Sequence, residues 1–445
     1  MPAAALSRRA ALRCAAAAPC RAPSRAPRRW LSAEPEPELL IANAPGLRVV
    51  DLHRPQALNS INHSMTRTLL PLVQDWQQPQ GGVEMVVLRG SGPRAFCAGG
   101  DIRYLYHCAT AGEESALAAG RAFVHDEYTL NHALGSSRIP IVSLLEGIVM
   151  GGGVGLSVHG QVRVATESTL FAMPETGIGF FPDVGTTFVL PRLRGSLGMY
   201  LGLTGARLSG RDVLAAGVAT HYVDLERLPM LVTHPTPAGY TPRCPALTGF
   251  AGAQEGILAE LGKAASATGK PVDAAVLSNA IGSLGRIEQA LSGEGAAAAE
   301  EAPPSYLDVH ADEIDHCFSQ PGVAAITAAV GELAGAVHGR EGAEAAAQHW
   351  AVRAQRGLAL ASPTSLAVTH EALRRGAALP TLAACLSMEY NMAQRFLLHP
   401  DLAAGIRAVL RLDGATGPAE WAEPPSEDEL AEFFVPGAGG ELALK

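Results

Sequence analysis

Several common signals are missing from this chain of 445 residues, and each absence argues against a class of protein. No run of eighteen apolar residues is present, so no membrane-spanning helix is predicted. The seven cysteines form no C-x-x-C pair and no zinc-like spacing, which indicates free thiols in a reducing compartment. The formal net charge of −9 argues against nucleic acid or an anionic membrane as the main partner.

Motifs for phosphate binding and for a serine nucleophile are missing as well. The chain contains no G-x-x-x-x-G-K-[ST], and residues 151–156 do not match G-x-G-x-x-G, which argues against P-loop and dinucleotide-binding enzymes. The stretch GLSVHG at 155–160 differs from the nucleophile elbow G-x-S-x-G, because His159 replaces the last glycine and no strand runs directly into Ser157. We therefore interpret Ser157 and His159 as structural residues.

The first 33 residues lack acidic side chains and carry seven arginines among alanine, proline and serine. This composition is typical of a transit peptide, and the arginines interrupt the apolar stretch that a secretory signal needs. The C-terminal ELALK is not a peroxisomal signal of the S-K-L kind. We predict a mitochondrial transit peptide over residues 1–33 and the mitochondrial matrix as the location, with the chloroplast as the alternative.

The chain has ample material for a large core, because 48% of all its residues are hydrophobic and 17% are charged. We predict a catalytic core over 34–225, an enlarged insertion over 226–305, and a helical C-terminal region over 306–445 that completes the active site. The insertion ends in the low-complexity stretch GEGAAAAEEAPP. Hydrophobic patterns predict strands at 47–53, 83–89, 141–145 and 161–166, and helices at 64–76, 113–134 and 379–398.

Two glycine-rich stretches each come between a predicted strand and a predicted helix: Gly99-Gly100 and Gly151-Gly152-Gly153. Glycine lets a backbone N–H approach a ligand closely, and the start of a helix adds unpaired donors, so each stretch suits an anion or an oxyanion. Two such donors are the number that an oxyanion hole needs. A tight turn with close helix packing would use the same glycines, so the pattern alone leaves both interpretations open.

Two carboxylates, Glu175 and Asp183, follow in a loop of almost wholly apolar residues rich in phenylalanine, glycine and proline. Burial in such a loop raises the pKa of a carboxyl group, which suits a general base or a nucleophile. The alternative is that each acid only caps a turn or a helix. The pair next to a backbone anion site favours chemistry.

Four long motifs, in the same order along the chain, resemble the crotonase (enoyl-CoA hydratase/isomerase) superfamily. They are FCAGGDI (96–102), IPIVSLLEGIVMGGGVGLS (139–157), FAMPETGIGFFPDVG (171–185) and LTGARLSGRDVLAAGVATHYV (203–223). The resemblance covers about residues 45–225 strongly and continues more weakly to residue 410. It implies an α/β fold, a crotonase-like spiral of ββα repeats with a helical C-terminal region.

The resemblance also implies roles for individual residues. The N–H groups of Gly100 and Gly152 would form the oxyanion hole for a thioester oxygen, Glu127 would contact the substrate, and Glu175 and Asp183 would be the catalytic pair, all five lining the substrate-binding site. No metal and no cofactor are implied, since CoA is part of the acyl-CoA substrate. Departures from the family pattern are Gln56 in place of a lysine, which weakens an expected contact to the CoA phosphates, and Ala404 in place of a glutamate.

The position of Gly155 decides which reaction the resemblance favours, because hydratases of the superfamily carry their second catalytic glutamate there. The motifs are most similar to the branch that hydrolyses (S)-3-hydroxyisobutyryl-CoA in valine catabolism, with 3-hydroxypropionyl-CoA as a further substrate. An enoyl-CoA hydratase/isomerase and a non-catalytic acyl-CoA-binding member are the alternatives. The sequence leaves open whether the chain forms a homo-oligomer and whether Glu175 attacks directly or activates water.

Overall fold

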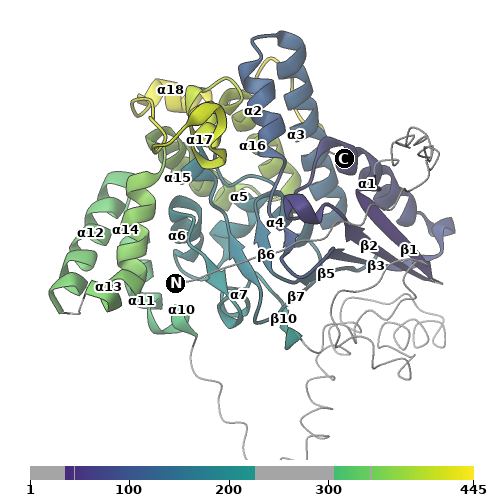
Figure 1. Ribbon diagram of the computed structural model, residues 1–445, viewed down its shortest axis with the longest axis horizontal. Helices are drawn as coiled ribbons and strands as arrows, with labels where there is room; N and C mark the ends of the chain where they lie inside the picture. Colours follow the sequence, from purple (N-terminus) through teal and green to yellow (C-terminus); the bar gives the residue numbers. More distant parts are fainter. Residues whose placement is uncertain (1–35, 45, 226–304, 341–342, 445) are drawn as a thin grey trace, which may run out of the picture. The chain divides into compact units, whose positions relative to one another are not determined.

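Two β-sheets form the centre of the computed structural model, which describes residues 36–44, 46–225, 305–340 and 343–444 (Figure 1). Residues from Glu38 onward belong to one unit. The predicted transit peptide and the predicted insertion, apart from residue 305, lie outside the described residues. The strands are β1 (Leu39–Ala44), β2 (Gly46–Leu52), β3 (Val83–Gly90), β4 (Ala95–Cys97), β5 (Ile141–Leu145), β6 (Ile148–Met150), β7 (Val162–Ala165), β8 (Leu170–Ala172), β9 (Leu208–Ser209) and β10 (His221–Tyr222).

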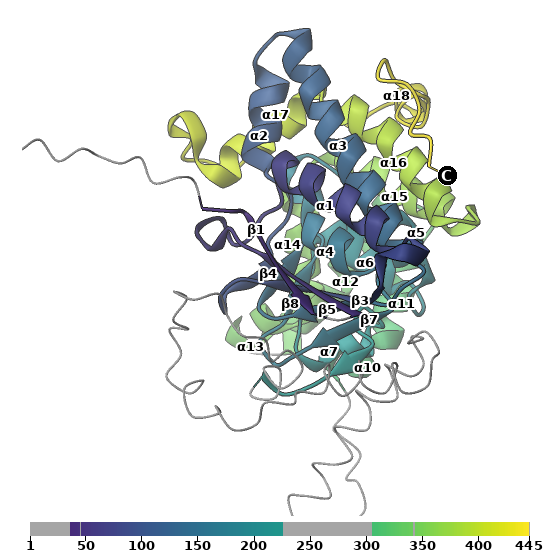
Figure 2. The same ribbon diagram turned by 90° about the vertical axis from the view of Figure 1, so that its right-hand side faces the viewer.

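The larger sheet has six strands in the order β1-β2-β3-β5-β7-β10, and the smaller has four in the order β4-β6-β8-β9. The large sheet is parallel from β2 to β10, and only the β1–β2 pair is antiparallel. All five residues of β5 are buried, as expected for a central parallel strand that is covered on both faces. In Figure 2, α1 and α3 lie on one side of the large sheet and α7 on the other.

Successive pairs of strands follow one another as a spiral. β3, β5 and β7 each enter the large sheet, and the strand that follows each of them, β4, β6 or β8, enters the small one. A helical segment then leads to the next pair of strands. Each new strand pairs in parallel with an earlier strand of its sheet, and parallel pairing requires such a crossover. This arrangement confirms the spiral of ββα repeats predicted from the resemblance.

Helices surround the sheets and are the main elements of the described C-terminal part. Among the described helices, none combines the length and apolar character that crossing a membrane requires. The helices are α1 (His63–Trp76), α2 (Ile102–Thr110), α3 (Glu114–Gly135), α4 (Gly152–Ser157), α5 (Thr186–Val189), α6 (Leu197–Thr204), α7 (Arg211–Ala215), α10 (Tyr306–Val309), α11 (Ala311–Phe318), α12 (Val323–Arg340), α13 (Ala343–Gln348), α14 (Trp350–Leu360), α15 (Pro363–Ala378), α16 (Leu382–Phe396), α17 (Pro400–Leu410) and α18 (Glu427–Glu432).

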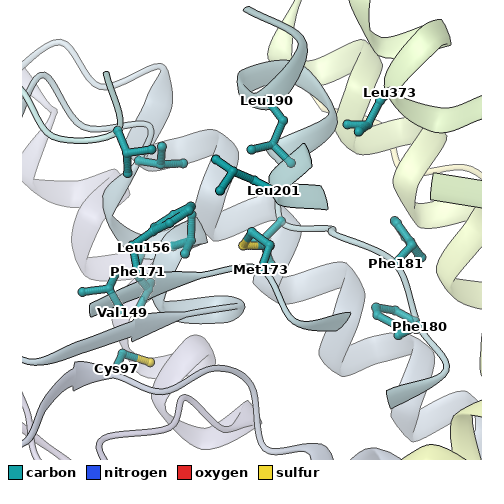
Figure 3. Packing of buried hydrophobic residues seen from close by; sticks show 14 of the residues in the cluster. Cys97, Val149, Leu156, Phe171, Met173, Phe180, Phe181, Leu190, Leu201 and Leu373 are labelled. Carbon is teal, nitrogen blue, oxygen red and sulfur yellow. The ribbon is translucent and has the colours of Figure 1, made fainter. Parts of the chain in front are cut away.

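Buried hydrophobic side chains form a core between the small sheet and the helices that cover it. Figure 3 shows Val149 of β6 and Phe171 of β8 packed with Leu156 of α4 and with Met173, all at most 1% exposed. Phe181 in the following loop stacks on Phe396 of α16, with ring centroids 5.5 Å apart. The apolar loop that carries both predicted acids is therefore anchored to the core at its two ends.

The structure corrects two details of the predicted elements. The strand at 141–145 does not run into the triple glycine, because Glu146 and Gly147 end it and the separate strand β6 follows. The helix predicted over 379–398 begins at Leu382, since Pro380 lacks an N–H and the Thr381 side chain caps the helix by accepting a hydrogen bond from the N–H of Ala384. The described cysteines, Cys97, Cys108, Cys317 and Cys385, are buried free thiols, as predicted.

Candidate active site

The two glycine stretches meet at the start of α4. The N–H of Ile61 donates to the carbonyl of Gly99 at 2.9 Å, and the N–H of Asp101 donates to the carbonyl of Ile61 at 2.8 Å. This pairing leaves the N–H of Gly100 between them, and a Cβ added to Gly152 would lie 3.0 Å from the nitrogen of Gly100. No described residue accepts a hydrogen bond from the N–H of Gly100 or Gly152. Two adjacent backbone donors are thus available to one oxygen.

Glycine is required at this junction for two separate reasons. Gly151 has φ +48°, a conformation that residues with a side chain rarely adopt. A Cβ on Gly152 would lie 2.5 Å from Oε1 of Glu127 and 3.0 Å from Cγ2 of Ile61. The tight turn with close packing, which the sequence left open as an alternative, is therefore present together with the two donors.

Glu127 faces both glycines from the middle of α3. Its side chain is 5% exposed, and both carboxylate oxygens lie 3.8 Å from the position that a Cβ on Gly100 would take. No described residue hydrogen-bonds to its buried Oε1. Burial, and next the negative charge of Asp183, raise the pKa of Glu127 well above its usual range. The structure therefore places a poorly solvated carboxyl beside the two donors.

Glu175 lies close to the same glycines. It is the first residue of the 3₁₀ turn Glu175–Ile178. Its Oε1 lies 2.8 Å from the position that a Cβ on Gly151 would take, and its buried Oε2 has no hydrogen-bond partner among the described residues. The side chain is 6% exposed. Burial, and next the charge of Asp183, raise the pKa of Glu175 well above its usual range, as the apolar loop predicted.

Asp183 completes the group, and its partner was not predicted. The hydroxyl of Tyr128, next to Glu127 on α3, donates to Oδ2 of Asp183 at 2.8 Å. Burial raises the pKa of Asp183 to about 7, although the Tyr128 bond acts in the opposite direction. Glu127 and Glu175 both face the glycines, and Tyr128, next to Glu127, holds Asp183, so the three acids lie in one cluster. All five predicted site residues are thus brought together.

Removal of the Tyr128 hydroxyl is expected to raise the pKa of Asp183 further. The phenol stabilises the charged carboxylate, so Tyr128→Phe leaves burial unopposed and moves the midpoint above about 7. The measurement is a ¹³C NMR titration of the Asp183 carboxyl in the two proteins. Tyr106 is half-buried and its hydroxyl donates an exposed hydrogen bond to Asp413, so Tyr106→Phe is the matched control. A midpoint that stays or falls in Tyr128→Phe contradicts the prediction.

The family model for enoyl-CoA hydratase/isomerase matches residues 47–238 and 246–429. This chain belongs to that family. A 3-hydroxyisobutyryl-CoA hydrolase, mitochondrial, of Xenopus tropicalis is 35% identical over 92% of this chain and 91% of its own. The small ribosomal subunit protein mS47 of Neurospora crassa is 38% identical over 89% of this chain and 70% of its own. A crystal structure titled carnitinyl-CoA dehydratase from Mycobacterium thermoresistibile has a TM-score of 0.68 at 33% identity, covering 92% of this chain and 99% of that chain.

Gly155 stands where the resemblance places the second glutamate of hydratases, and its surroundings leave no room for a side chain. A Cβ on Gly155 would lie 2.5 Å from Cβ of Val184 and 2.9 Å from Nδ2 of Asn131. Val184 and Asn131 are at most 1% exposed, so neither can move into solvent. A glutamate at 155 is therefore incompatible with this arrangement of the Asp183 loop.

The C-terminal helices reach the same loop. Glu389 of α16, which is fully buried, accepts hydrogen bonds from the N–H of Gly185 at 2.6 Å and from both the N–H and the hydroxyl of Thr187. Gly405 of α17 packs directly on the backbone of Ile178, beside Glu175. Glu389 was missed as a site residue, although it lies in the part of the chain, before residue 410, over which the resemblance continues more weakly. Gln56, the first departure from the family pattern, is exposed.

One other group of side chains among the described residues has metal-ligand chemistry: His310, Glu313 and His349, whose ligand atoms lie within 4.8 Å of one another. The carboxylate of Glu313 contacts the ring of His310 at 2.9 Å and accepts from the indole of Trp350 at 3.0 Å. The ring of His349 caps α14 by accepting from the N–H of Ala351. These bonds account for the group as a structural network, and it shares no residue with the acid cluster.

Proposed function

We propose that this protein hydrolyses (S)-3-hydroxyisobutyryl-CoA to 3-hydroxyisobutyrate and free CoA in valine catabolism, and that it also accepts 3-hydroxypropionyl-CoA. The observation that carries the proposal is the buried pair Glu175 and Asp183 next to two backbone donors, with no space for a second glutamate at Gly155. The relative from Xenopus tropicalis, matched over nearly the whole chain, bears the name of this activity. No metal or cofactor is needed in this scheme.

The first half of the reaction transfers the acyl group to the enzyme. The thioester oxygen accepts hydrogen bonds from the N–H groups of Gly100 and Gly152, which stabilise the charge that develops on it. A carboxylate oxygen of Glu175 attacks the thioester carbon, and the carbon–sulfur bond breaks. Asp183 gives its proton to the leaving thiolate, so that free CoA departs and a mixed anhydride remains on Glu175. The pKa of Asp183 near 7 allows this transfer at neutral pH.

The second half returns the enzyme to its starting state. Asp183, now a carboxylate, takes a proton from water, and the water oxygen attacks the carbonyl carbon of Glu175 in the anhydride. The bond between the Glu175 carbonyl carbon and the bridging oxygen breaks, and the bridging oxygen leaves as part of 3-hydroxyisobutyrate. The second water proton leaves with the acid product. The alternative is direct attack on the thioester by a water that Glu175 deprotonates. The buried Oε2 of Glu175, which has no hydrogen-bond partner among the described residues, favours the anhydride, because a poorly solvated carboxylate is a stronger nucleophile.

A thiol assay tests the proposed function directly. The purified protein is mixed with (S)-3-hydroxyisobutyryl-CoA and a reagent that reports free thiol, and in parallel with crotonyl-CoA, whose hydration is followed by loss of enoyl absorbance. Release of CoA from the hydroxyacyl ester with little hydration supports the proposal. Crotonyl-CoA hydration as fast as 3-hydroxyisobutyryl-CoA cleavage would instead support a hydratase.

Asp183→Asn is expected to lower kcat by at least about 10²-fold, the usual contribution of a general acid or base. The amide keeps the shape of the side chain and can still accept from the hydroxyl of Tyr128, but it cannot carry the proton. The measurement is kcat and KM for the hydroxyacyl ester in the two proteins. Asp212→Asn on α7 is a control outside the cluster. A loss below about threefold would remove Asp183 from the proton transfers.

A second candidate is a component of the small ribosomal subunit of mitochondria, favoured by the 38% identity to protein mS47 of Neurospora crassa. Such a role requires no turnover, so it would make this chain a non-catalytic member of the family. Sedimentation of a mitochondrial lysate separates the candidates: a ribosomal component travels with the small subunit, whereas a free enzyme stays near the top as a monomer or small oligomer. Turnover measured on both fractions then decides whether one protein does both.

We propose import into the mitochondrial matrix through the arginine-rich residues 1–33; the relative from Xenopus tropicalis carries the word mitochondrial in its name. Removal of about the first thirty residues is expected to leave a folded, active protein, because an Arg/Ala/Pro-rich segment buries too little apolar surface to join a core. The measurement is turnover of the truncated protein, together with imaging of a fluorescent fusion of residues 1–40. Loss of solubility on truncation, or a fusion that stays in the cytosol, counts against import by this segment.

A further inference from the structure

The backbone next to Asp183 is held in an unfavourable conformation. Val184 has φ +54°, in the left-handed region that glycine favours and that a β-branched side chain strongly disfavours. The following residue, Gly185, also has a positive φ of +85°. A strained residue persists only where its surroundings hold it, and such residues concentrate at functional sites. The contacts that hold this turn are therefore informative.

His159 holds the turn from one side. Its Nε2 lies 2.7 Å from the carbonyl oxygen of Val184. Burial lowers the pKa of His159 to about 4, so the ring is neutral at physiological pH. Because a carbonyl only accepts, Nε2 carries the hydrogen and donates it. From the sequence we interpreted His159 as a structural residue. Its partner, the carbonyl of the residue that follows Asp183, was not predicted.

Glu389 holds the turn from the other side, 204 residues away along the chain. Its two carboxylate oxygens accept from the N–H of Gly185 and from Thr187, and none of its surface is exposed. Burial raises the pKa of Glu389 to about 8, and the hydrogen bonds from Thr187 and Gly185 oppose that shift. No cation among the described residues pairs with Glu389, and a buried carboxyl without such a partner is costly. Its hydrogen bonds come from Gly185 and Thr187, which follow Asp183.

His159 and Leu382 pack closely against the turn at Gly185. A Cβ on Gly185 would lie 2.5 Å from Nε2 of His159 and 2.7 Å from Cδ1 of Leu382. The carboxylate of Asp183 is at the same time fixed by the hydroxyl of Tyr128. Side chains from α3, from the segment that follows α4 and from α16 therefore converge on three consecutive residues, 183–185.

We propose that His159 and Glu389 are positioning residues for Asp183: together they hold the strained Val184–Gly185 backbone and thereby aim the Asp183 carboxylate at the reacting thioester. The proposal deepens the proposed hydrolase function and rests on it. Loss of either contact lets the backbone of Val184 relax to a negative φ, which rotates the adjoining peptide and withdraws the carboxylate. Substrate binding by the glycines and Glu175 does not depend on this turn.

The test compares His159→Leu, which removes the donor and keeps the volume, with His159→Gln, which can still donate an N–H to the carbonyl of Val184. His159→Leu is expected to lower kcat by about tenfold or more with KM within about threefold, and His159→Gln to retain most of kcat. His338→Leu removes a comparable contact between a histidine ring and a backbone carbonyl, that of Ala334 on α12, and serves as the control. Equal kcat in His159→Leu and the wild type overturns the proposal.

A double-mutant cycle separates positioning from general damage to the fold. In an Asp183→Asn background, His159→Leu is expected to lower the residual kcat by less than about threefold, because the group that it positions is already lost. The same fold loss in both backgrounds overturns the proposal, since it shows that His159 acts without Asp183. If His159→Leu does not fold, Glu389→Gln takes its place in the cycle, because the amide keeps the shape but turns one donor toward the N–H groups of Gly185 or Thr187.

An NMR titration tests the same idea without turnover. The Asp183 midpoint, near 7 in the wild type, is expected to fall toward its usual range in His159→Leu as the carboxylate swings away from its buried position, and to stay in place in His338→Leu. An unchanged midpoint in His159→Leu overturns the proposal. If the wild type cleaves no hydroxyacyl ester, the proposed function fails, and the titration still decides whether His159 positions Asp183.

Discussion

Glu175→Gln is expected to lower kcat by about 10³-fold or more, while CoA esters still bind. The amide has nearly the shape of the carboxylate, so the glycine donors remain in place, but it is a very poor nucleophile and base. The buried Oε2 of Glu175 makes no hydrogen bond to a described residue, so its replacement by an NH₂ group breaks none that the structure shows. The measurement is single-turnover and steady-state release of CoA, with affinity followed separately by calorimetry.

The matched control is Glu146→Gln. Glu146 is half-buried after β5, and burial raises its pKa too, yet it lies outside the cluster of Gly100, Glu127, Gly152, Glu175 and Asp183. It should keep near wild-type turnover. Near wild-type turnover in Glu175→Gln itself would contradict the whole assignment of the active site, and not only the anhydride route.

Heavy-oxygen water distinguishes the two routes in the wild-type enzyme. In a single turnover through the anhydride, water attacks the carbonyl carbon of Glu175, and the label appears in the Glu175 side chain. Direct attack of water on the thioester puts the label only into the product acid. Mass spectrometry of the peptide that contains Glu175 gives the answer, and Glu175→Asp, with its shorter reach, shows whether the position of the carboxylate limits the first step.

Gly152→Ala is the second change with a large expected effect, on the order of 10²- to 10³-fold in kcat, as for the loss of one oxyanion donor. The added methyl group would lie 3.0 Å from the nitrogen of Gly100 and 2.5 Å from Oε1 of Glu127, so it fills the space between the two donors. It also forces Glu127 to move, and KM is expected to rise as well. The measurement is kcat and KM for the hydroxyacyl ester and the affinity for a non-hydrolysable CoA thioether.

A glycine without neighbours provides the control for this substitution. Gly335 lies exposed in α12, and an added Cβ there meets no atom within 4 Å. Gly335→Ala is expected to leave turnover unchanged and to raise the melting temperature slightly, because alanine favours the helix. Full activity in Gly152→Ala would show that the thioester oxygen binds elsewhere.

The long motifs made the catalytic half of the fold predictable. The helix start at Gly152, the buried strand at 141–145 and the apolar loop with Glu175 and Asp183 are all local features, and each lies where its pattern indicated. The strands β4, β6 and β8 were not predicted because each has three residues, which is too short for an alternating pattern. Their pairing in a separate sheet is a tertiary property.

The remaining site residues depend on contacts between distant parts of the chain. Tyr128 is 55 residues from Asp183, and Glu389 is 204 residues from Gly185, so no local pattern joins them. His159 was visible in the sequence, but its partner is a backbone carbonyl. Every residue has a backbone carbonyl, so the sequence does not indicate which one a side chain contacts. The left-handed Val184 was equally hidden, because valine is a residue from which a negative φ is expected.

The contact between Gly155 and Val184 makes a change of reaction in this protein a coupled event. A mutation that introduced a glutamate at 155 would push away the turn that carries Asp183, so gaining one acid displaces the other. The substitutions at 155 and 184 are therefore epistatic, and each is harmful without the other. Directed evolution from hydrolysis toward hydration must cross an intermediate in which neither set of acids is complete, and libraries that vary one position at a time will miss that route.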